Sequence, residues 1–256
     1  MKFLHSIFAA LFLCLAAVNL PGGVLIYEGG TRAGNAAAAA SSLGLTYTIV
    51  DGDDWDIFDN VLYGSVWDLV VIDAPSTWNS SLSQSIATYI ASGGKVMMSY
   101  WYAKEDPILT AAFEVQISPV HFFSPQNVYP WDLAHPIFHS PNPDIGPLTS
   151  WTDIWWGTDL EYAAPVGSAV ALAGFSATPE NGIAAIILGN NGRTLYNSFL
   201  WDNIGDQMGV QLIANQISFL LNSQNAAVPE PSTFVLLGSA LLGLGWMQMK
   251  RHNAIH

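Results

Sequence analysis

Ser99 directly follows the apolar run Val96-Met97-Met98, and its hydroxyl is a candidate nucleophile for a serine hydrolase. In such an enzyme the serine lies in a Gly-x-Ser-x-Gly turn between a strand and a helix. Met97 and Trp101 occupy the two glycine positions here. Ser99 is therefore a catalytic candidate by position alone, since the surrounding signature is missing.

The segment Asp51-Gly52-Asp53-Asp54-Trp55-Asp56 offers closely spaced carboxylates, the oxygen ligands that Ca²⁺ prefers. It does not match an EF-hand, because Trp55 takes a ligand position and no distal glutamate follows. Acidic residues also favour the positive end of a helix dipole, so a helix start explains them equally. We keep Asp51 and Asp53 as ligand-binding candidates and predict no metal site.

Three histidines, His121, His135 and His139, lie between the two ends of the chain. His135 and His139 are four residues apart, but Pro136 and Pro141 argue against the continuous helix that a metalloprotease site requires. No His-Glu-x-x-His motif is present. The sequence predicts neither a metal ion nor a cofactor.

Tryptophans gather in the middle of the chain, in a stretch rich in proline and aspartate. Tryptophan rings stack on sugars, and their amphipathic character suits binding surfaces. We therefore take Trp131, Trp155 and Trp156 of this stretch as ligand-binding candidates, together with Trp101, which precedes it. The alternative is that these rings seal the edge of a sheet.

The first half of the domain alternates short apolar strands with helices, which predicts parallel pairing and a sheet covered on both faces. Strands are expected at 24–27, 46–50, 69–72 and 96–98, and helices at 35–43, 55–63 and 82–91. Ligands in such sheets bind beyond the carboxyl ends of the strands. The segment 122–156 is expected to be a long Trp- and Pro-rich insertion. Strands follow at 166–172, 184–188 and 194–199, where partly antiparallel pairing at a sheet edge is expected, and a closing helix is expected at 205–221.

Together with Gly93-Gly94-Lys95 before the fourth strand, this order resembles the class I glutamine amidotransferase-like domains, a flavodoxin-like group that includes ThuA-type proteins. Ala134 to Phe138 and Gly192 to Tyr196 are similar to that group as well. The resemblance implies an α/β fold over residues 23–222, with a mainly parallel sheet and helices on both faces. The family carries its catalytic cysteine after the strand 96–98, where this chain has Ser99. Amidotransferase chemistry is therefore not expected.

The chain is strongly acidic, with a net charge of −13. Between its two ends the only bases are Arg32, Lys95, Lys104 and Arg193. Such a charge argues against nucleic acid as a partner, since that binding depends on neutralising phosphates with cations.

The N-terminus has the pattern of a secretory signal peptide over residues 1–22. Lys2 precedes an apolar run from Ile7 to Val18, which is too short for a comfortable membrane span. Cys14, the only cysteine of the chain, falls inside this run. Removal of the peptide would leave a domain without disulfides, thiolate metal sites or a cysteine nucleophile.

The C-terminus has three consecutive parts. A linker at 223–233 contains Val228-Pro229-Glu230-Pro231-Ser232-Thr233, an apolar stretch at 234–249 follows, and Lys250 and Arg251 open a short basic tail at 250–256. The apolar stretch predicts a transmembrane helix near the minimum length, about 25 Å at 1.5 Å per residue. The two cations act as a membrane stop on the cytoplasmic side, which places the domain outside.

This three-part pattern resembles the PEP-CTERM sorting signal of Gram-negative bacteria. The resemblance implies that an exosortase recognises Pro229, Glu230 and Pro231 in the inner membrane, processes the chain near that motif, and passes it to the envelope or the extracellular matrix. It concerns the destination of the chain and not the activity of the domain.

Two functions from different classes therefore remain open. The first is a non-catalytic surface or matrix protein whose domain binds a partner such as extracellular polysaccharide. The second is an exported hydrolase that uses Ser99 or acidic residues at the strand ends. Ser99 clustered with His121 or His135 and a carboxylate would favour the enzyme, and a tryptophan-lined groove would favour binding.

Overall fold

The computed structural model describes residues 22–28, 34–51, 55–73, 80–100, 103–122, 126–151, 160–201, 204–205 and 207–223. The fold lies within the unit that ends at Asn222. The N-terminal apolar run, Pro229 to Pro231, the predicted span 234–249, and Lys250 and Arg251 lie outside the described residues. In the part of the chain that is described, no helix is both long enough and apolar enough to cross a membrane.

The first half of the domain forms the predicted parallel layer. Its strands are β1 (Val24–Glu28), β2 (Tyr47–Asp51), β3 (Leu69–Asp73) and β4 (Val96–Ser99). The helices between them are α2 (Asn35–Ser42), α3 (Trp55–Gly64) and α4 (Ser80–Ala91). Every residue of β1, β3 and β4 is buried. Strands of this kind must be covered on both faces, which explains their continuous apolar character.

The second half is built differently. After β4 come the 3₁₀ turn η1 (Ala103–Glu105), α5 (Pro107–Ala112), β5 (Val115–Phe122), β6 (Tyr129–Pro130) and the 3₁₀ turn η2 (Pro136–Phe138). The chain then forms β7 (Leu160–Pro165), β8 (Val170–Gly174), β9 (Ala184–Gly189), β10 (Thr194–Asn197) and the closing helix α6 (Gln207–Asn222).

All described strands join one sheet with the order β2-β1-β3-β4-β10-β9-β7-β5, and β8 pairs with both β9 and β6. Pairing is parallel from β2 to β10 and antiparallel beyond β10. The sheet is therefore mixed and not mainly parallel, and its antiparallel part lies among the second-half strands. The reason is local: β9 returns to β10 through a tight turn in which Asn190 and Asn191 adopt positive φ, and short hairpins of this kind connect antiparallel strands.

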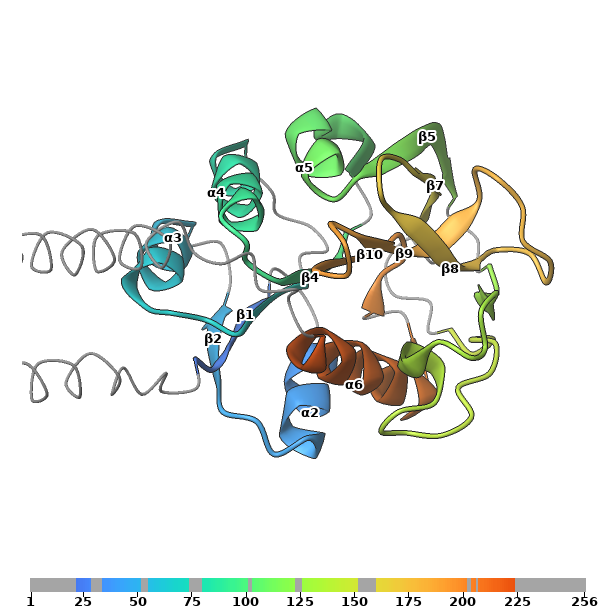
Figure 1. Ribbon diagram of the computed structural model, residues 1–256, viewed down its shortest axis with the longest axis horizontal. Helices are drawn as coiled ribbons and strands as arrows, with labels where there is room; N and C mark the ends of the chain where they lie inside the picture. The colour runs from blue at the N-terminus through green and yellow to red at the C-terminus, as the bar shows by residue number, and fades with distance from the viewer. Residues whose placement is uncertain are drawn as a thin grey trace, which may run out of the picture. The chain divides into compact units, whose positions relative to one another are not determined.

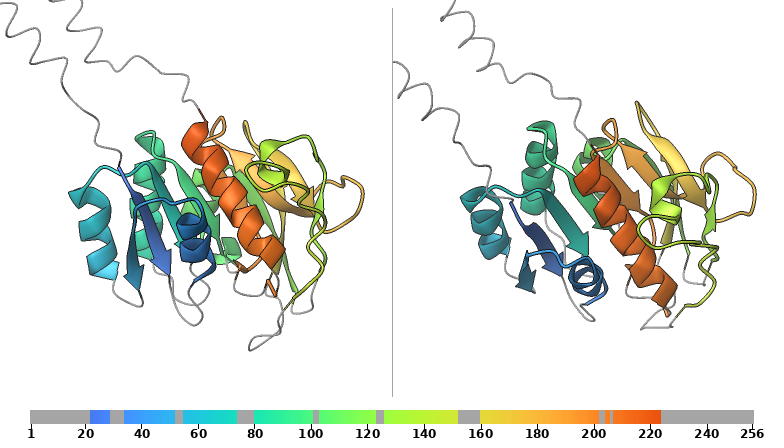
Figure 2. Two further views of the ribbon diagram at one scale, coloured as in Figure 1. Left: turned by 90° about the horizontal axis from the view of Figure 1, so that it is seen from below. Right: turned by 60° about the horizontal axis from the view of Figure 1, so that its bottom comes forward.

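Helices cover both faces of the parallel half (Figure 1). Helices α2 and α6 lie on one face, and α3, α4 and α5 lie on the other, as the two further views also show (Figure 2). The two hydrophobic clusters follow the alternation of each strand. Leu69 and Val71 of β3 face α2 and α6, whereas Val70 and Ile72 face the opposite helices.

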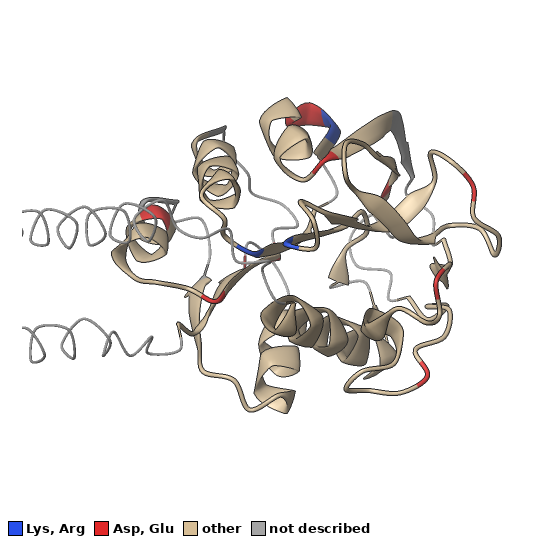
Figure 3. Ribbon diagram, viewed as in Figure 1, with Lys and Arg blue, Asp and Glu red and all other residues tan. Residues whose placement is uncertain are grey.

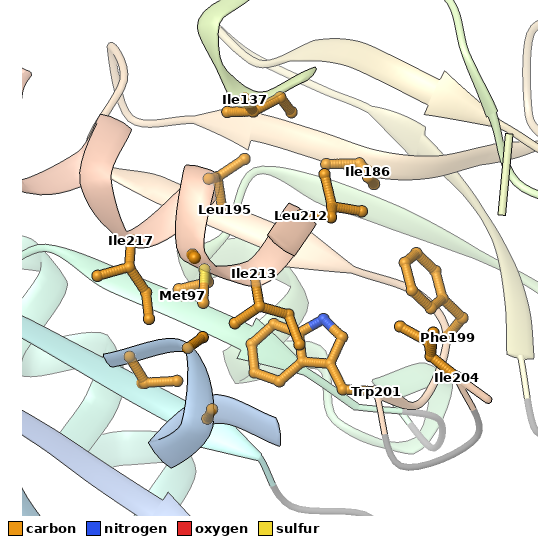
Figure 4. Close-up of a cluster of buried hydrophobic side chains, with 14 of the residues drawn as sticks. Met97, Ile137, Ile186, Leu195, Phe199, Trp201, Ile204, Leu212, Ile213 and Ile217 are labelled. Carbon is orange, nitrogen blue, oxygen red and sulfur yellow. The ribbon is translucent and has the colours of Figure 1, made fainter. Parts of the chain in front are cut away.

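The cluster beneath α6 is the larger of the two and spans both halves of the sheet. Trp201, which follows β10, is fully buried in it and packs with Ile213 of α6 and Met97 of β4 (Figure 4). Helix α6 carries no charged residue, and its face toward the sheet is buried. The segment after β10 is thereby fixed over the carboxyl end of β4, where the sequence had placed a candidate site.

Candidate functional site

The strand register brings polar residues into one row at the carboxyl edge of the parallel half. Asp51 of β2 pairs with Glu28 of β1, Glu28 with Asp73 of β3, Asp73 with Ser99 of β4, and Ser99 with Asn197 of β10. Glu28 and Asp73 are buried. This edge is where ligands bind in open α/β sheets, and the predicted strand ends do meet there.

Ser99, the catalytic candidate, is fully buried at this edge. Its hydroxyl donates to the carbonyl oxygen of Phe199 at 2.9 Å and accepts from the amide of Trp201 at 3.2 Å. Both bonds tie the end of β4 to the segment that follows β10. The hydroxyl thus holds two pieces of backbone together, and this geometry does not present it to a substrate.

The histidines named beside Ser99 do not form a triad with it among the described side chains. His135, at the start of η2, packs its ring 4.8 Å from the ring of Phe219 on α6. Burial lowers the pKa of His135. His121 lies in β5, opposite Glu161 of β7 in the strand register, and its side chain lies outside the described part. The arrangement that would have favoured the enzyme is therefore not present in what is described.

Next to Ser99, a buried amide pair joins the sheet to α6. Asn197 donates to Oε1 of Gln216 at 3.2 Å, and Gln216 donates back to Oδ1 of Asn197 at 2.9 Å. Asn197 also donates to the carbonyl of Met98 at 3.3 Å. Sequence reasoning missed this pair. The available indication was a glutamine within an apolar helix face, because buried polar groups need partners.

Glu161 in β7 is a second buried polar group that sequence reasoning missed. Its carboxyl accepts from the amide of Lys104, in the 3₁₀ turn η1 after β4, with Oε2 at 3.2 Å. Burial, the largest cause, raises the pKa of Glu161 from 4.5 to about 8. Tyr196 donates nearby to the carbonyl of Tyr100 at 3.1 Å, and burial raises its pKa as well. The side-chain carboxyl of Glu161 thus binds the backbone of the turn that follows β4.

An open hollow lies instead on the antiparallel half. Ala163 of β7, Ala184 of β9 and Gly174 of β8 are in direct register across the sheet. Three small residues side by side leave little side-chain bulk on that face. Trp131 covers one end of this row: a Cβ atom on Gly174 would come 1.8 Å from its ring. The indole Nε1 donates to the carbonyl of Ser176 at 2.9 Å, which fixes the ring.

A cavity of about 270 Å³ remains beside this ring. Its walls come from the strands of the second half and from the loop between β8 and β9: Trp131, Pro165, Ala171, Pro179, Glu180, Asn181, Gly182 and Ala184. Glu180 and Asn181 are exposed, whereas Ala184 at the base is buried. The cavity is thus open to solvent on the loop side and lined by an aromatic ring, a carboxylate and an amide.

The structure describes less of the other ligand-binding candidates. Trp101, Trp155, Trp156 and Asp53 lie outside the described residues, and of Asp51 only the backbone in β2 is described. Within the described ranges, no group of three histidine, cysteine, aspartate or glutamate side chains is arranged to hold a metal ion. Trp131 alone among the candidate tryptophans is therefore placed, and it lines the cavity.

Comparison with known proteins identifies the tail. Residues 227–251 match the PEP-CTERM protein-sorting motif. Such motifs are recognised by exosortase processing enzymes, and they imply export and membrane anchoring through the C-terminal sorting signal. The match covers the predicted Pro229-Glu230-Pro231 and extends to Arg251, so this resemblance is confirmed. No curated protein matches the chain.

Solved structures similar to the domain share its fold at low sequence identity. A putative ThuA-like protein from Bacteroides uniformis has a TM-score of 0.54 at 12% identity, with 81% of this chain and 95% of that chain covered. A putative GMP synthase subunit from Thermoplasma acidophilum has a TM-score of 0.53 at 15% identity, with 77% and 94% covered. A glutamine amidotransferase from Thermotoga maritima has a TM-score of 0.50 at 9% identity, with 78% and 98% covered. The domain therefore has the expected flavodoxin-like fold.

Proposed function

We propose that this chain is an exported cell-surface or matrix protein, sorted by an exosortase-type enzyme, whose α/β domain is a non-catalytic binding or structural module. The match of residues 227–251 to the PEP-CTERM motif carries the first part of the proposal. In this account the domain lies outside the inner membrane, and the apolar stretch 234–249 holds the chain there until processing releases it.

The non-catalytic role of the domain is supported by Ser99. Amidotransferase-like domains carry a cysteine at this place, and a serine there would need a free hydroxyl beside a base. Here the hydroxyl is buried and bonded to the backbone of Phe199 and Trp201. The neighbouring Asn197 is bonded to Gln216. The carboxyl end of β4 is accordingly used for packing.

A hydrolase remains the second candidate, and one observation favours it. Glu28 and Asp73 are paired on adjacent strands at the carboxyl edge, and two neighbouring carboxylates can divide the roles of acid and base. In that case Glu28→Gln and Asp73→Asn would each abolish turnover of chromogenic ester or glycoside substrates by the purified full chain. In the account preferred here the unaltered protein turns over none of them.

Sorting is tested in the producing bacterium with a chain in which Pro229→Ala and Pro231→Ala are combined. We expect the unaltered chain to lose its C-terminal residues and to reach the cell surface or the medium. The variant is expected to stay in the inner membrane at full length. Pro143→Ala, at an exposed position of the domain, is the matched control and should behave as the unaltered chain does. The same distribution for the tail variant would contradict the proposal.

A further inference from the structure

The cavity beside Trp131 combines three chemical features. The indole offers an apolar ring, Glu180 offers a carboxylate, and Asn181 offers both a donor and acceptors. A sugar ring has apolar C–H faces and hydroxyl groups at its edge. A site with one aromatic surface and a few polar groups suits such a ligand, since the ring contributes apolar contact and the polar groups set orientation.

The small residues of the sheet give the cavity its shape. Ala184 and Ala171 line it with small side chains, and Gly174 makes room for the Trp131 ring. The hydrogen bond from Trp131 to Ser176 holds the ring in place without a ligand. Because the ring is already fixed, binding costs little side-chain ordering. The volume of about 270 Å³ is small for a ligand pocket, so the cavity suits one ring better than a long segment of chain.

The negative charge of the cavity lining and of the whole chain restricts the class of sugar that can bind. The cavity lining contains one carboxylate and no lysine or arginine, and the chain as a whole carries a net charge of −13. Figure 3 shows acidic residues spread over the domain and few basic ones among the described residues. Uronate and sulfated sugars would be repelled by such a surface, whereas hydroxyl groups can donate to the carboxylate.

We infer that the Trp131 cavity is a subsite for a neutral sugar ring of an extracellular polysaccharide. This inference rests on the proposed function, since a domain delivered to the cell surface meets such polymers. It goes further in naming the residues that bind: Trp131 stacks on the sugar, and Glu180 and Asn181 bond its hydroxyls. The carboxyl edge around Ser99 takes no part.

The test is affinity electrophoresis of the purified full chain in neutral detergent, in native gels that contain dextran, mannan, galactan or alginate. The acidic chain migrates toward the anode, so retention by a polymer is measured directly. We expect retardation by at least one of the three neutral polymers and none by alginate. Trp131→Ala should weaken retention about ten-fold or more, and Glu180→Gln and Asn181→Ala about three- to ten-fold each.

Two matched controls lie away from the cavity. Tyr63→Ala removes an exposed aromatic ring from α3, and Glu105→Gln neutralises an exposed carboxylate in η1. Both should leave retention unchanged. Trp131 also packs on Gly174, so each variant is checked by circular dichroism. Glu180 and Asn181 are exposed loop residues, and their variants decide the question if Trp131→Ala does not fold.

The outcomes separate this inference from the proposed function. Unchanged retention of folded Trp131→Ala, or of both Glu180→Gln and Asn181→Ala, would overturn the assignment of the site and leave surface delivery intact. Retention by alginate alone, or by none of the polymers, would overturn the choice of ligand. The delivery of the chain is judged independently, by the tail variant and the cell fractions.

Discussion

Polar residues have opposite environments in the two halves of the sheet. At the carboxyl edge of the parallel half, Ser99 and Asn197 are fully buried and bonded to other parts of the same domain. On the antiparallel half, Glu180 and Asn181 face solvent beside the Trp131 ring and an open cavity. The edge that holds ligands in many α/β proteins is closed at β4 and β10, and the open concavity lies elsewhere.

This difference shows that a shared fold does not fix where function lies. The parallel half carries the strand edge at which ligands bind in open α/β sheets, yet its polar side chains at β4 and β10 stabilise the domain. In the antiparallel half, the small residues Ala163, Gly174 and Ala184 of adjacent strands leave a hollow. Substitutions at the carboxyl edge of the first half should therefore change stability without changing binding, and substitutions in the lining of the Trp131 cavity should change binding.

Ionisation of Glu161 should have the largest effect on the stability of the domain. Burial raises its pKa to about 8 from 4.5, so the folded chain keeps a proton that the unfolded chain loses above pH 4.5. The stability that Glu161 contributes is fully present below that pH and is lost as the pH rises to about 8. The loss is on the order of a few kcal/mol.

Glu161→Gln should remove this dependence, because glutamine cannot ionise and still accepts from the Lys104 amide. The comparison is made by urea unfolding of both chains between pH 5 and pH 9. The free energies of unfolding of the two chains should be similar at pH 5. At pH 9 the variant should be the more stable one. Parallel pH profiles would show that Glu161 is not the group responsible.

The amide pair of Asn197 and Gln216 should come next. Asn197→Leu leaves the buried amide of Gln216 without its partner, at a cost of about 2 to 4 kcal/mol. Combining it with Gln216→Leu should restore part of that loss, since no buried side-chain amide is then left without the other. A double-mutant cycle by urea unfolding measures the coupling, and strictly additive losses would contradict the pair.

Gly174→Ala is expected to lower both the stability of the domain and its binding to polysaccharide. The added Cβ would come 1.8 Å from the Trp131 ring, so the ring must move. We expect a loss of about 1 to 3 kcal/mol from overpacking. Retention on neutral polysaccharide should fall together with that loss. Thermal unfolding and affinity electrophoresis report the two effects, and normal retention with normal stability would show that the ring does not lie there.

Ser99→Ala should have the smallest of these effects. It removes two hydrogen bonds to the backbone of Phe199 and Trp201, at a cost of about 1 to 2 kcal/mol. Retention by polysaccharide should not change, because the hydroxyl lies at the other half of the sheet. Loss of any ester-hydrolysing activity that the unaltered chain shows would instead identify Ser99 as a nucleophile.

The parallel half could be predicted from sequence because its information is local. Each strand is a short apolar run, and Gly93, which adopts φ +100°, ends α4 where the sequence placed the stop. The second half was predicted less well. The first part of the expected strand 166–172 is a turn in which Gly167 adopts φ +63°, and only its last three residues belong to a strand, the beginning of β8. Strand β5 contains a proline and polar residues and was not predicted at all.

The candidate site, too, could be predicted from the sequence only in part. The strand ends at Glu28, Asp73 and Ser99 could be predicted, but their burial could not. Trp131 was chosen for its ring, whereas its place depends on Gly174, which lies 43 positions later and is reached through the pairing of β6 with β8. Glu161 lies 57 positions from Lys104, whose amide it accepts. Long-range contacts of this kind leave no periodic pattern in the sequence.

The central claim is that this domain is delivered to the cell surface by its tail and acts there by binding. The most direct test is the intact mass of the protein recovered from the surface and the medium of the producing bacterium. The account predicts a chain that lacks the N-terminal apolar run and ends near Pro231. A chain that keeps residues 232–256 and is found only in the inner membrane would contradict it.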